Sequence, residues 1–231
     1  MKKFPIGVNL YEFHCDNQLT DEVLKDIKTK EIHYLKSQPH NTKVPNNYGM
    51  VGYMDKNYQI PYYHEKLFDW FQECVDKVIA DTIPNTNLII SDSWVTKLNF
   101  GQHASNVHVH SNSVCSGLFY LTTHKKSYTN FYPKNSIAEC MTFESNSFVQ
   151  NNSLHDENSV YMSYPESGKL LIFPSSLAHN VSVHNEPNIR HTIAFNTYYQ
   201  GRFGEPTTYL QIKVKSVKEI YEDFINGKSI C

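Results

Sequence analysis

The chain has 231 residues, 40% of them hydrophobic, which is enough to bury one sizeable core. The formal net charge is −2 with the histidines neutral. A chain of this charge has no overall attraction to a phosphate backbone or to anionic lipid. We therefore expect a single domain over residues 1–231, with duplex nucleic acid and membranes disfavoured as partners.

The five cysteines are scattered along the chain, and no two of them form a Cys-x-x-Cys pair. An odd number of scattered cysteines favours reduced thiols over a disulfide framework. No stretch approaches the roughly 20 apolar residues that span a bilayer, and the basic N-terminus lacks the apolar core of a signal peptide. We therefore expect a soluble, cytoplasmic protein.

The N-terminal part of the chain predicts helices. Residues 20–38 and 64–82 carry apolar side chains at helical spacing. Thr20 is the expected N-cap of the first helix, because two acids that favour the helix dipole follow it. The Pro, Asn and Gly residues in segment 37–57 predict a loop between the helices. Together these elements form a helical and loop support over residues 1–85.

After residue 86 the chain changes to short β-branched and aromatic runs separated by turn residues. Such runs predict the strands of a sandwich or barrel. The runs are "LIISDSWVTKLNF", "SGLFYLTTH", "GKLLIFPSS", "NVSVH" and "RHTIAFNTYY". Segment 139–159 is polar and has no period, which predicts a long loop of the kind that often forms a lid. The expected fold is mostly β with N-terminal helices, its barrel over 86–200 and a C-terminal extension over 201–231.

Two histidines stand two residues apart in "HVHSNSVCSGL". On a strand, residues i and i+2 point to the same face, so His108 and His110 can aim at one point. The segment "GKLLIFPSSLAH" ends in His179, which begins the next strand and offers a third imidazole. Such a metal site keeps coordination positions open for chemistry. The alternative is a pair of solvent-facing histidines on an edge strand.

Arg190 is a lone cation in the otherwise apolar strand "RHTIAFN". Burying it is costly unless an anion meets it, and a guanidinium matches a carboxylate well. The anion is either a protein acid or a bound one. Alternation places Thr192 and Asn196 on the same face as Arg190, and Tyr120 on the inward face of another strand. These three side chains are therefore candidates for contacting the same bound acid.

Several of these segments resemble the Fe(II)- and 2-oxoglutarate-dependent oxygenases, specifically those of cyanobacterial and related marine phages. They are "HVHSNSVCSGLFYL", "GKLLIFPSSLAH" and "RHTIAFN", with "VNLYEFHCDNQLTDEVL" similar to that group's N-terminal opening. The resemblance implies a double-stranded β-helix, a jelly-roll barrel of cupin-like shape. It also implies Fe(II) as the metal, 2-oxoglutarate as cosubstrate, O₂ as co-reactant, and hydroxylation with release of succinate and CO₂. A phage-encoded enzyme would act in the host cytoplasm.

By this resemblance His108 is the first metal ligand and His179 the distal one. Arg190 then anchors the far carboxylate of 2-oxoglutarate, with Thr192 as its hydroxyl companion and Tyr120 as an assisting phenol. Asn196 is a candidate for cosubstrate contact from strand register alone.

His110 departs from the pattern, because the superfamily has a carboxylate at this position. A neutral imidazole there raises the net charge at the metal by one. One interpretation, which we favour, is that His110 ligates the metal. A second is that a carboxylate such as Glu139, Asp92 or Glu144 ligates in its place. A third is that water or an anion fills the position, and room for a halide would allow halogenation instead of hydroxylation.

Other classes of protein remain open. A cupin would add a glutamate after the His-x-His pair, where this chain has "SNSVCSG". A three-histidine zinc or iron protein without 2-oxoglutarate chemistry would activate water. A non-enzymatic ligand-binding barrel would show no metal dependence.

The sequence does not identify the substrate, for which a small molecule, a peptide or a nucleobase would fit, or the oligomeric state. Substrate contacts are expected in segments 47–63 and 139–159, because specificity lies on loops carried by a rigid barrel. The remaining candidates are expected to be structural: His103, His124, His155, His184, His191 and Cys115.

Overall fold

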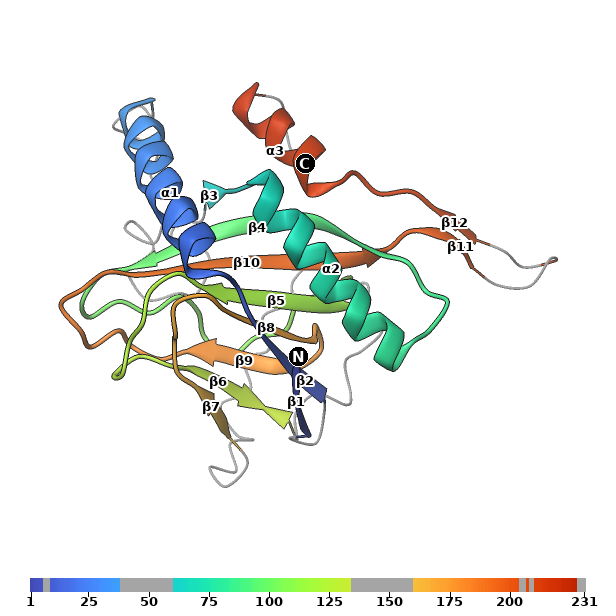
Figure 1. Ribbon diagram of the computed structural model, residues 1–231, viewed down its shortest axis with the longest axis horizontal. Coiled ribbons are helices and arrows are strands. Elements are labelled where there is room, and N and C mark those ends of the chain that lie inside the picture. Colours follow the sequence, from blue (N-terminus) through green and yellow to red (C-terminus); the bar gives the residue numbers. More distant parts are fainter. Residues whose placement is uncertain (6–8, 38–59, 134–159, 204–206, 208–209, 228–231) are drawn as a thin grey trace.

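The large sheet is the centre of the molecule (Figure 1). The computed structural model describes residues 1–5, 9–37, 60–133, 160–203, 207 and 210–227. The seven strands of the large sheet are ordered β1-β2-β8-β5-β10-β4-β3. Their bounds are β1 Lys2–Pro5, β2 Asn9–His14, β3 Ile60–Pro61, β4 Leu88–Leu98, β5 Cys115–Tyr120, β8 Lys169–Pro174 and β10 Arg190–Tyr199.

A three-stranded sheet and a helical layer cover the two faces of the large sheet. The small sheet has the order β7-β6-β9. Its strands are β6 Thr129–Tyr132, β7 Tyr161–Ser163 and β9 Ala178–Val181. The remaining elements are the helices α1 Asn17–Ser37, α2 Glu65–Thr82 and α3 Val217–Ile225, and the hairpin strands β11 Gly201–Phe203 and β12 Leu210–Ile212. The predicted mostly β, jelly-roll fold with supporting helices is thereby confirmed.

Strand alternation divides the core into two layers. On β5, Phe119 packs toward α2, while Leu118 and Tyr120 pack between the two sheets with Phe131 of β6. Because side chains on a strand alternate between faces, one strand supplies both layers. The space between the two sheets therefore receives every second residue of the central strands.

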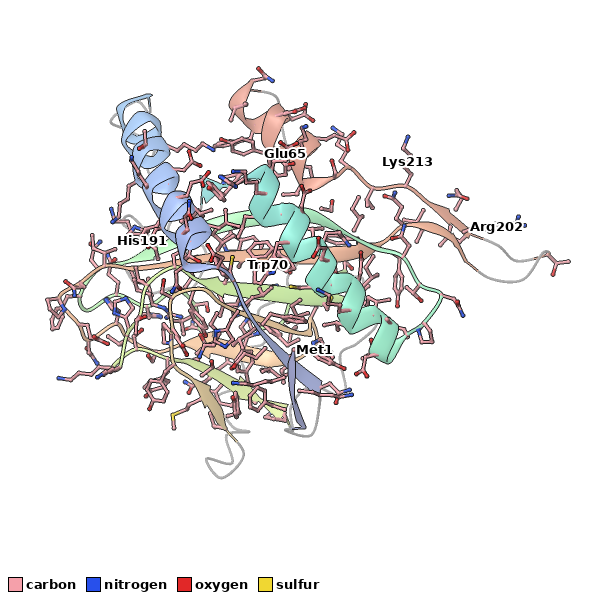
Figure 2. All side chains as sticks on the ribbon, in the orientation of Figure 1. Met1, Glu65, Trp70, His191, Arg202 and Lys213 are labelled. Atoms are coloured by element: carbon pink, nitrogen blue, oxygen red, sulfur yellow. The ribbon has the colours of Figure 1, made fainter. Side chains whose placement is uncertain are left out.

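Aromatic rings join α2 to the large sheet (Figure 2). The ring centroids of Trp70 and Phe71 lie 5.9 and 5.3 Å from that of Phe119. A Cβ placed on Gly117 would lie 2.1 Å from Cζ of Phe195. The absence of a Cβ at this position is thus what makes room for the Phe195 ring beside β5.

Strand β4 contains a bulge. The pairing of β4 with β10 shifts register directly after Asn196, whose partner is Asp92, and Ser91 is left as the extra residue. An extra residue reverses the faces of the positions on its two sides. Ile90 accordingly packs in the layer under α2, whereas Trp94, also even-numbered, packs between the sheets.

The start of the first helix differs from the sequence prediction. The helix begins at Asn17, and Oδ1 of Asp16 accepts hydrogen bonds from the backbone N–H groups of Gln18 and Leu19 at 2.8 and 3.2 Å. Asp16 is therefore the N-cap. Thr20 lies inside the first turn, where its hydroxyl bonds back to the carbonyl of Asp16, so its prediction as the cap was wrong.

The large sheet also includes strands from the segment predicted as helical and loop support. β2 pairs with β8 and β1 pairs with β2, so the N-terminus extends the large sheet. The sequence pattern did not indicate β6, β7, β11, β12 or α3. Segment 139–159 and most of segments 37–57 and 47–63 lie outside the described residues. Among the described helices, none is long and apolar enough to cross a membrane.

Candidate metal and cosubstrate site

The structure brings His108, His110 and His179 together. One ring nitrogen of each lies within 4.8 Å of the others. His108 and His179 exchange two backbone hydrogen bonds of 3.0 Å, and the backbone N–H of His110 donates to the carbonyl of Ser175 at 2.9 Å. The "HVH" segment therefore runs beside β9 and the turn before it, and these backbone bonds set where the three imidazoles point.

Each imidazole presents the same nitrogen to the centre of the cluster. Nδ1 of His108 lies 2.9 Å from the carbonyl oxygen of Asn106, and Nδ1 of His179 lies 2.9 Å from that of Leu177. A carbonyl only accepts hydrogen bonds, so both Nδ1 atoms carry the proton. Their Nε2 atoms are then free to act as ligands, as in metal sites whose histidines are oriented by an outer acceptor.

The ring of His110 is also oriented by a hydrogen-bond acceptor at Nδ1, here a side chain instead of a backbone carbonyl. Its Nδ1 lies 2.6 Å from Oδ1 of Asn196 and 2.9 Å from Oγ of Ser116. Nδ1 of His110 therefore donates to the amide oxygen, and its Nε2 faces that of His108 at 3.2 Å. Two unprotonated nitrogens at this distance repel each other unless a cation lies near both, so the cluster fits a bound metal ion.

Burial keeps the three imidazoles neutral. Burial lowers the pKa of His108, and burial together with the other two rings lowers that of His179 well below its usual value. Burial, followed by the neighbouring His108 ring, lowers the pKa of His110 to about 4. Neutral imidazole is the form that binds metals, so the cluster needs no deprotonation at neutral pH.

Asn196 contacts the metal cluster through His110. Its amide oxygen accepts from His110, and its backbone N–H and side-chain NH₂ donate to the carboxylate of Asp92 at 3.1 and 3.5 Å. Asp92 is therefore not among the clustered ligands, although it was one of the acids that could have replaced His110. Glu139 and Glu144, the other two, lie outside the described residues.

Arg190 is the other charged group of the site, and it is 1% exposed. Its Nη1 donates to Oγ of Ser127 at 3.3 Å and its Nη2 to Oγ1 of Thr129 at 3.1 Å, while its buried Nε has no partner. Burial lowers its pKa to about 10, so the group is charged at neutral pH. No carboxylate among the described residues pairs with Arg190.

Tyr120 and Thr192 lie beside Arg190. The Tyr120 hydroxyl donates to Oγ1 of Thr129 at 3.0 Å, and the guanidinium carbon lies 5.6 Å from the centre of the Tyr120 ring. Tyr120 and Thr192 are direct partners across β5 and β10. Because Thr129 accepts from both Tyr120 and Arg190, its own proton is left to donate elsewhere. Sequence reasoning missed Thr129 and Ser127.

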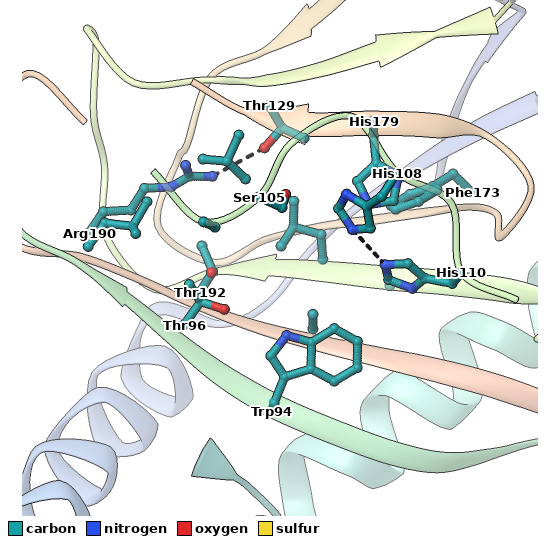
Figure 3. A pocket seen from close by; sticks show the side chains of 16 residues that line it. Trp94, Thr96, Ser105, His108, His110, Thr129, Phe173, His179, Arg190 and Thr192 are labelled. Carbon is teal, nitrogen blue, oxygen red and sulfur yellow. Dashed lines mark hydrogen bonds between the residues drawn. The ribbon is translucent and has the colours of Figure 1, made fainter. Parts of the chain in front are cut away.

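A cavity of about 70 Å³ connects the two groups of residues. Figure 3 shows Arg190 at one end and the three imidazoles at the other, with Thr192 between them and Trp94 along one wall. Thr129 also lines the cavity, so its hydroxyl can reach a ligand bound there. The arrangement can hold a metal ion at one end and an anionic group of a bound acid at the other.

The residues expected to be structural lie elsewhere. His124 and His184 are fully buried and pack edge to face at 4.7 Å, away from the metal cluster. His191 is buried, and His103 is half-buried. Cys115 is buried beside Thr197, and burial raises its thiol pKa to about 11, which makes it unreactive. His155 lies outside the described residues.

The jelly-roll fold places three imidazoles and a buried arginine around one cavity, an arrangement that could hold a metal ion and an acidic ligand. Residues 92–196 match the family described as "Putative 2OG-Fe(II) oxygenase". The match supports an assignment to the 2-oxoglutarate- and Fe(II)-dependent oxygenases. The expected cofactors, Fe(II) and 2-oxoglutarate, are confirmed at the level of this family, and the three imidazoles would hold the metal.

Solved structures share the fold. The apo form of ThoJ, a non-heme monooxygenase, is similar with a TM-score of 0.61 at 10% identity, over 96% of this chain and 92% of that one. HygX from Streptomyces hygroscopicus, with nickel and 2-oxoglutarate bound, has a TM-score of 0.54 at 10% identity, over 83% and 82% of the two chains. At these identities the likeness establishes the fold. No curated protein matches the sequence.

Proposed function

We propose that the protein is an Fe(II)- and 2-oxoglutarate-dependent oxygenase that hydroxylates a small-molecule, peptide or nucleobase substrate and releases succinate and CO₂. Bound iron with 2-oxoglutarate would supply the activation of O₂. The chain itself supplies binding and orientation in the cavity between the metal cluster and Arg190.

The observation that carries the proposal is that Arg190 is buried and charged, yet has no carboxylate partner among the described residues. A structural arginine at 1% exposure would be paired with a protein carboxylate, because an unpaired buried charge costs several kcal/mol. Here two neutral hydroxyls are the only groups among the described residues that hydrogen-bond the guanidinium. A carboxylate entering the cavity would complete this pairing, with Thr192 and Thr129 as further donors.

The three imidazoles suit a doubly charged cosubstrate. A divalent ion with three neutral ligands keeps its full charge of +2, and 2-oxoglutarate carries −2. With the charge of Arg190 included, the metal-loaded site carries +3, and a dianion that contacts both the metal and Arg190 reduces this to +1. Compensating most of the charge lowers the cost of enclosing it in a cavity that includes Leu98, Leu118 and Phe173.

Three neutral imidazoles also fit a second candidate function, because they are the ligands that hold Zn²⁺ in hydrolytic sites that keep one position open for water. That function would leave the unpaired charge of Arg190 without a role. The two candidates differ in whether 2-oxoglutarate binds at the metal.

The test is an anaerobic titration of the metal-free protein with Fe(II) and then with 2-oxoglutarate. We expect a visible charge-transfer band that needs both additions, followed by succinate formation when O₂ is admitted. His179→Ala should abolish the band. His103→Ala removes a nearby half-buried histidine outside the cluster, and should leave the band unchanged.

Tight metal binding without a band, and without succinate, would overturn the proposal and favour the hydrolytic candidate. His110→Ala tests the unusual ligand separately. An unchanged band position together with an unchanged Fe(II) affinity in this variant would show that His110 does not ligate the metal.

A further inference from the structure

We infer that Asp92 is a positioning residue, which acts through Asn196 to make His110 a metal ligand. The inference rests on the metal site of the proposed function. It concerns which of its two ring nitrogens the third imidazole presents to the metal.

His110 is held differently from the other two imidazoles. Backbone carbonyls fix the rings of His108 and His179, and a carbonyl can only accept a hydrogen bond. The ring of His110 is fixed by the side-chain amide of Asn196. An amide has an acceptor and a donor of almost the same shape, and rotating it by half a turn exchanges them.

The rotated amide would disable the site. Its NH₂ group would face Nδ1 of His110, which would then have to accept a hydrogen bond. The proton of the neutral ring would move to Nε2, the atom that faces His108 and the metal position. A protonated nitrogen cannot ligate a metal, so His110 would leave the coordination sphere.

Ser116 does not decide between the two orientations, because its hydroxyl can donate to the amide oxygen or accept from the NH₂ group. Asp92 does decide. Its carboxylate accepts from both the backbone N–H and the NH₂ of Asn196, and a rotated amide would place oxygen against oxygen. The charge of Asp92 thereby selects the amide orientation, and the amide selects the tautomer of His110.

The bulge at Ser91 supplies this geometry. The register of β4 against β10 shifts at that residue, and Asp92 lies directly opposite Asn196. Asp92 is therefore a carboxylate that orients the third imidazole from outside the metal's coordination sphere, in a site whose clustered ligands among the described residues include no carboxylate.

The decisive variant is Asp92→Asn, whose amide no longer imposes one orientation on Asn196. Nitrogen-15 NMR of the metal-free protein reports the tautomer of His110. We expect only the Nδ1–H form in the wild type and a mixture with Nε2–H in the variant. The Zn²⁺ affinity of the variant should fall about tenfold, the lower end of the range for outer partners of metal-bound histidines.

The swap Asp92→Asn with Asn196→Asp provides the rescue. It places a carboxylate, which can only accept, directly against His110, and should restore both the Nδ1–H tautomer and Zn²⁺ binding. A purely structural role of Asp92 would not predict this rescue. Asp76→Asn removes an acid on the exposed face of α2 and is the matched control, with no expected effect on either readout.

An Asp92→Asn protein that keeps the single tautomer and binds Zn²⁺ like the wild type would overturn the inference while leaving the metal site intact. A folded double variant that fails to recover Zn²⁺ binding would also overturn it, even if the single variant does not fold. Failure of the proposed function would give a different result, because in that case the wild type itself would not bind Zn²⁺ through the three imidazoles.

Discussion

Replacement of Arg190 by methionine should make the ligand-free protein more stable and, at the same time, abolish cosubstrate binding. Methionine is unbranched, of similar length and uncharged, so it can fill the space of the arginine stem. An uncompensated buried charge costs about 3–5 kcal/mol, which its removal regains. The hydroxyls of Ser127 and Thr129 each lose one hydrogen bond, worth about 1 kcal/mol. The net expectation is a gain of about 1–3 kcal/mol.

At about 2–4 °C per kcal/mol for a chain of this size, the melting temperature of the metal-free protein should rise by several degrees. Binding of 2-oxoglutarate should respond in the opposite direction. Leaving its far carboxylate buried without a partner costs about 3–5 kcal/mol, which corresponds to a loss of affinity between roughly one hundredfold and several thousandfold.

The assay is thermal and urea unfolding of the metal-free protein, followed by a 2-oxoglutarate titration of the Zn²⁺-loaded protein. Arg202→Met replaces an exposed arginine on β11 and should change neither quantity. A lower melting temperature for Arg190→Met would refute the reasoning, because it would mean that Arg190 has an ionic partner within the protein. Unchanged 2-oxoglutarate affinity would refute it as well.

Thr129→Val should weaken 2-oxoglutarate binding about tenfold, the value of one hydrogen bond of about 1.4 kcal/mol, and leave Zn²⁺ affinity unchanged in the same titrations. Gly117→Ala should cost about 1–3 kcal/mol in urea unfolding, because its Cβ would meet the ring of Phe195, and Gly117→Ala with Phe195→Leu should recover part of that loss. The metal-free protein should lose stability as the pH falls below about 6.5. Burial lowers the pKa of His124 and of the three clustered histidines, so over that range the unfolded chain binds more protons than the folded one. His124→Gln should reduce the slope of the unfolding free energy between pH 7 and pH 5, and an equal slope would contradict this assignment.

Strand alternation allowed part of the site to be predicted from the sequence. Arg190 and Thr192 share a face of β10 because they are two residues apart. The expected strand over His108 and His110 does not form: His108 makes an isolated bridge to His179, and His110 lies outside the strands. Backbone hydrogen bonds instead fix the segment beside β9 and the turn before it. The buried arginine and its face are therefore visible in the printed sequence, whereas the geometry of the cluster is not.

The missed residues depend on contacts between distant parts of the chain. Thr129 meets Arg190 across 61 residues, and Asn196 meets His110 across 86. No periodicity relates such pairs, so Thr129 gave no signal and Asn196 was assigned from register to cosubstrate contact. The structure supports another role for Asn196, the orientation of His110. The N-terminal strands were missed because β1 and β2 are short and acquire their sheet only by pairing with β8.

The bulge in β4 has a consequence for how relatives of this protein can diverge. Ser91 is the one unpaired residue between the helix-packed start of the strand and the cavity-facing remainder. An insertion or deletion in the connection from α2, before residue 88, that shifts the start of β4 changes only the number of extra residues at the bulge. Asp92 then stays directly opposite Asn196. Such a connection is free to drift in length over evolution, whereas a one-residue insertion or deletion between Asp92 and Leu98 would turn the cavity-facing residues on one side of it to the wrong face.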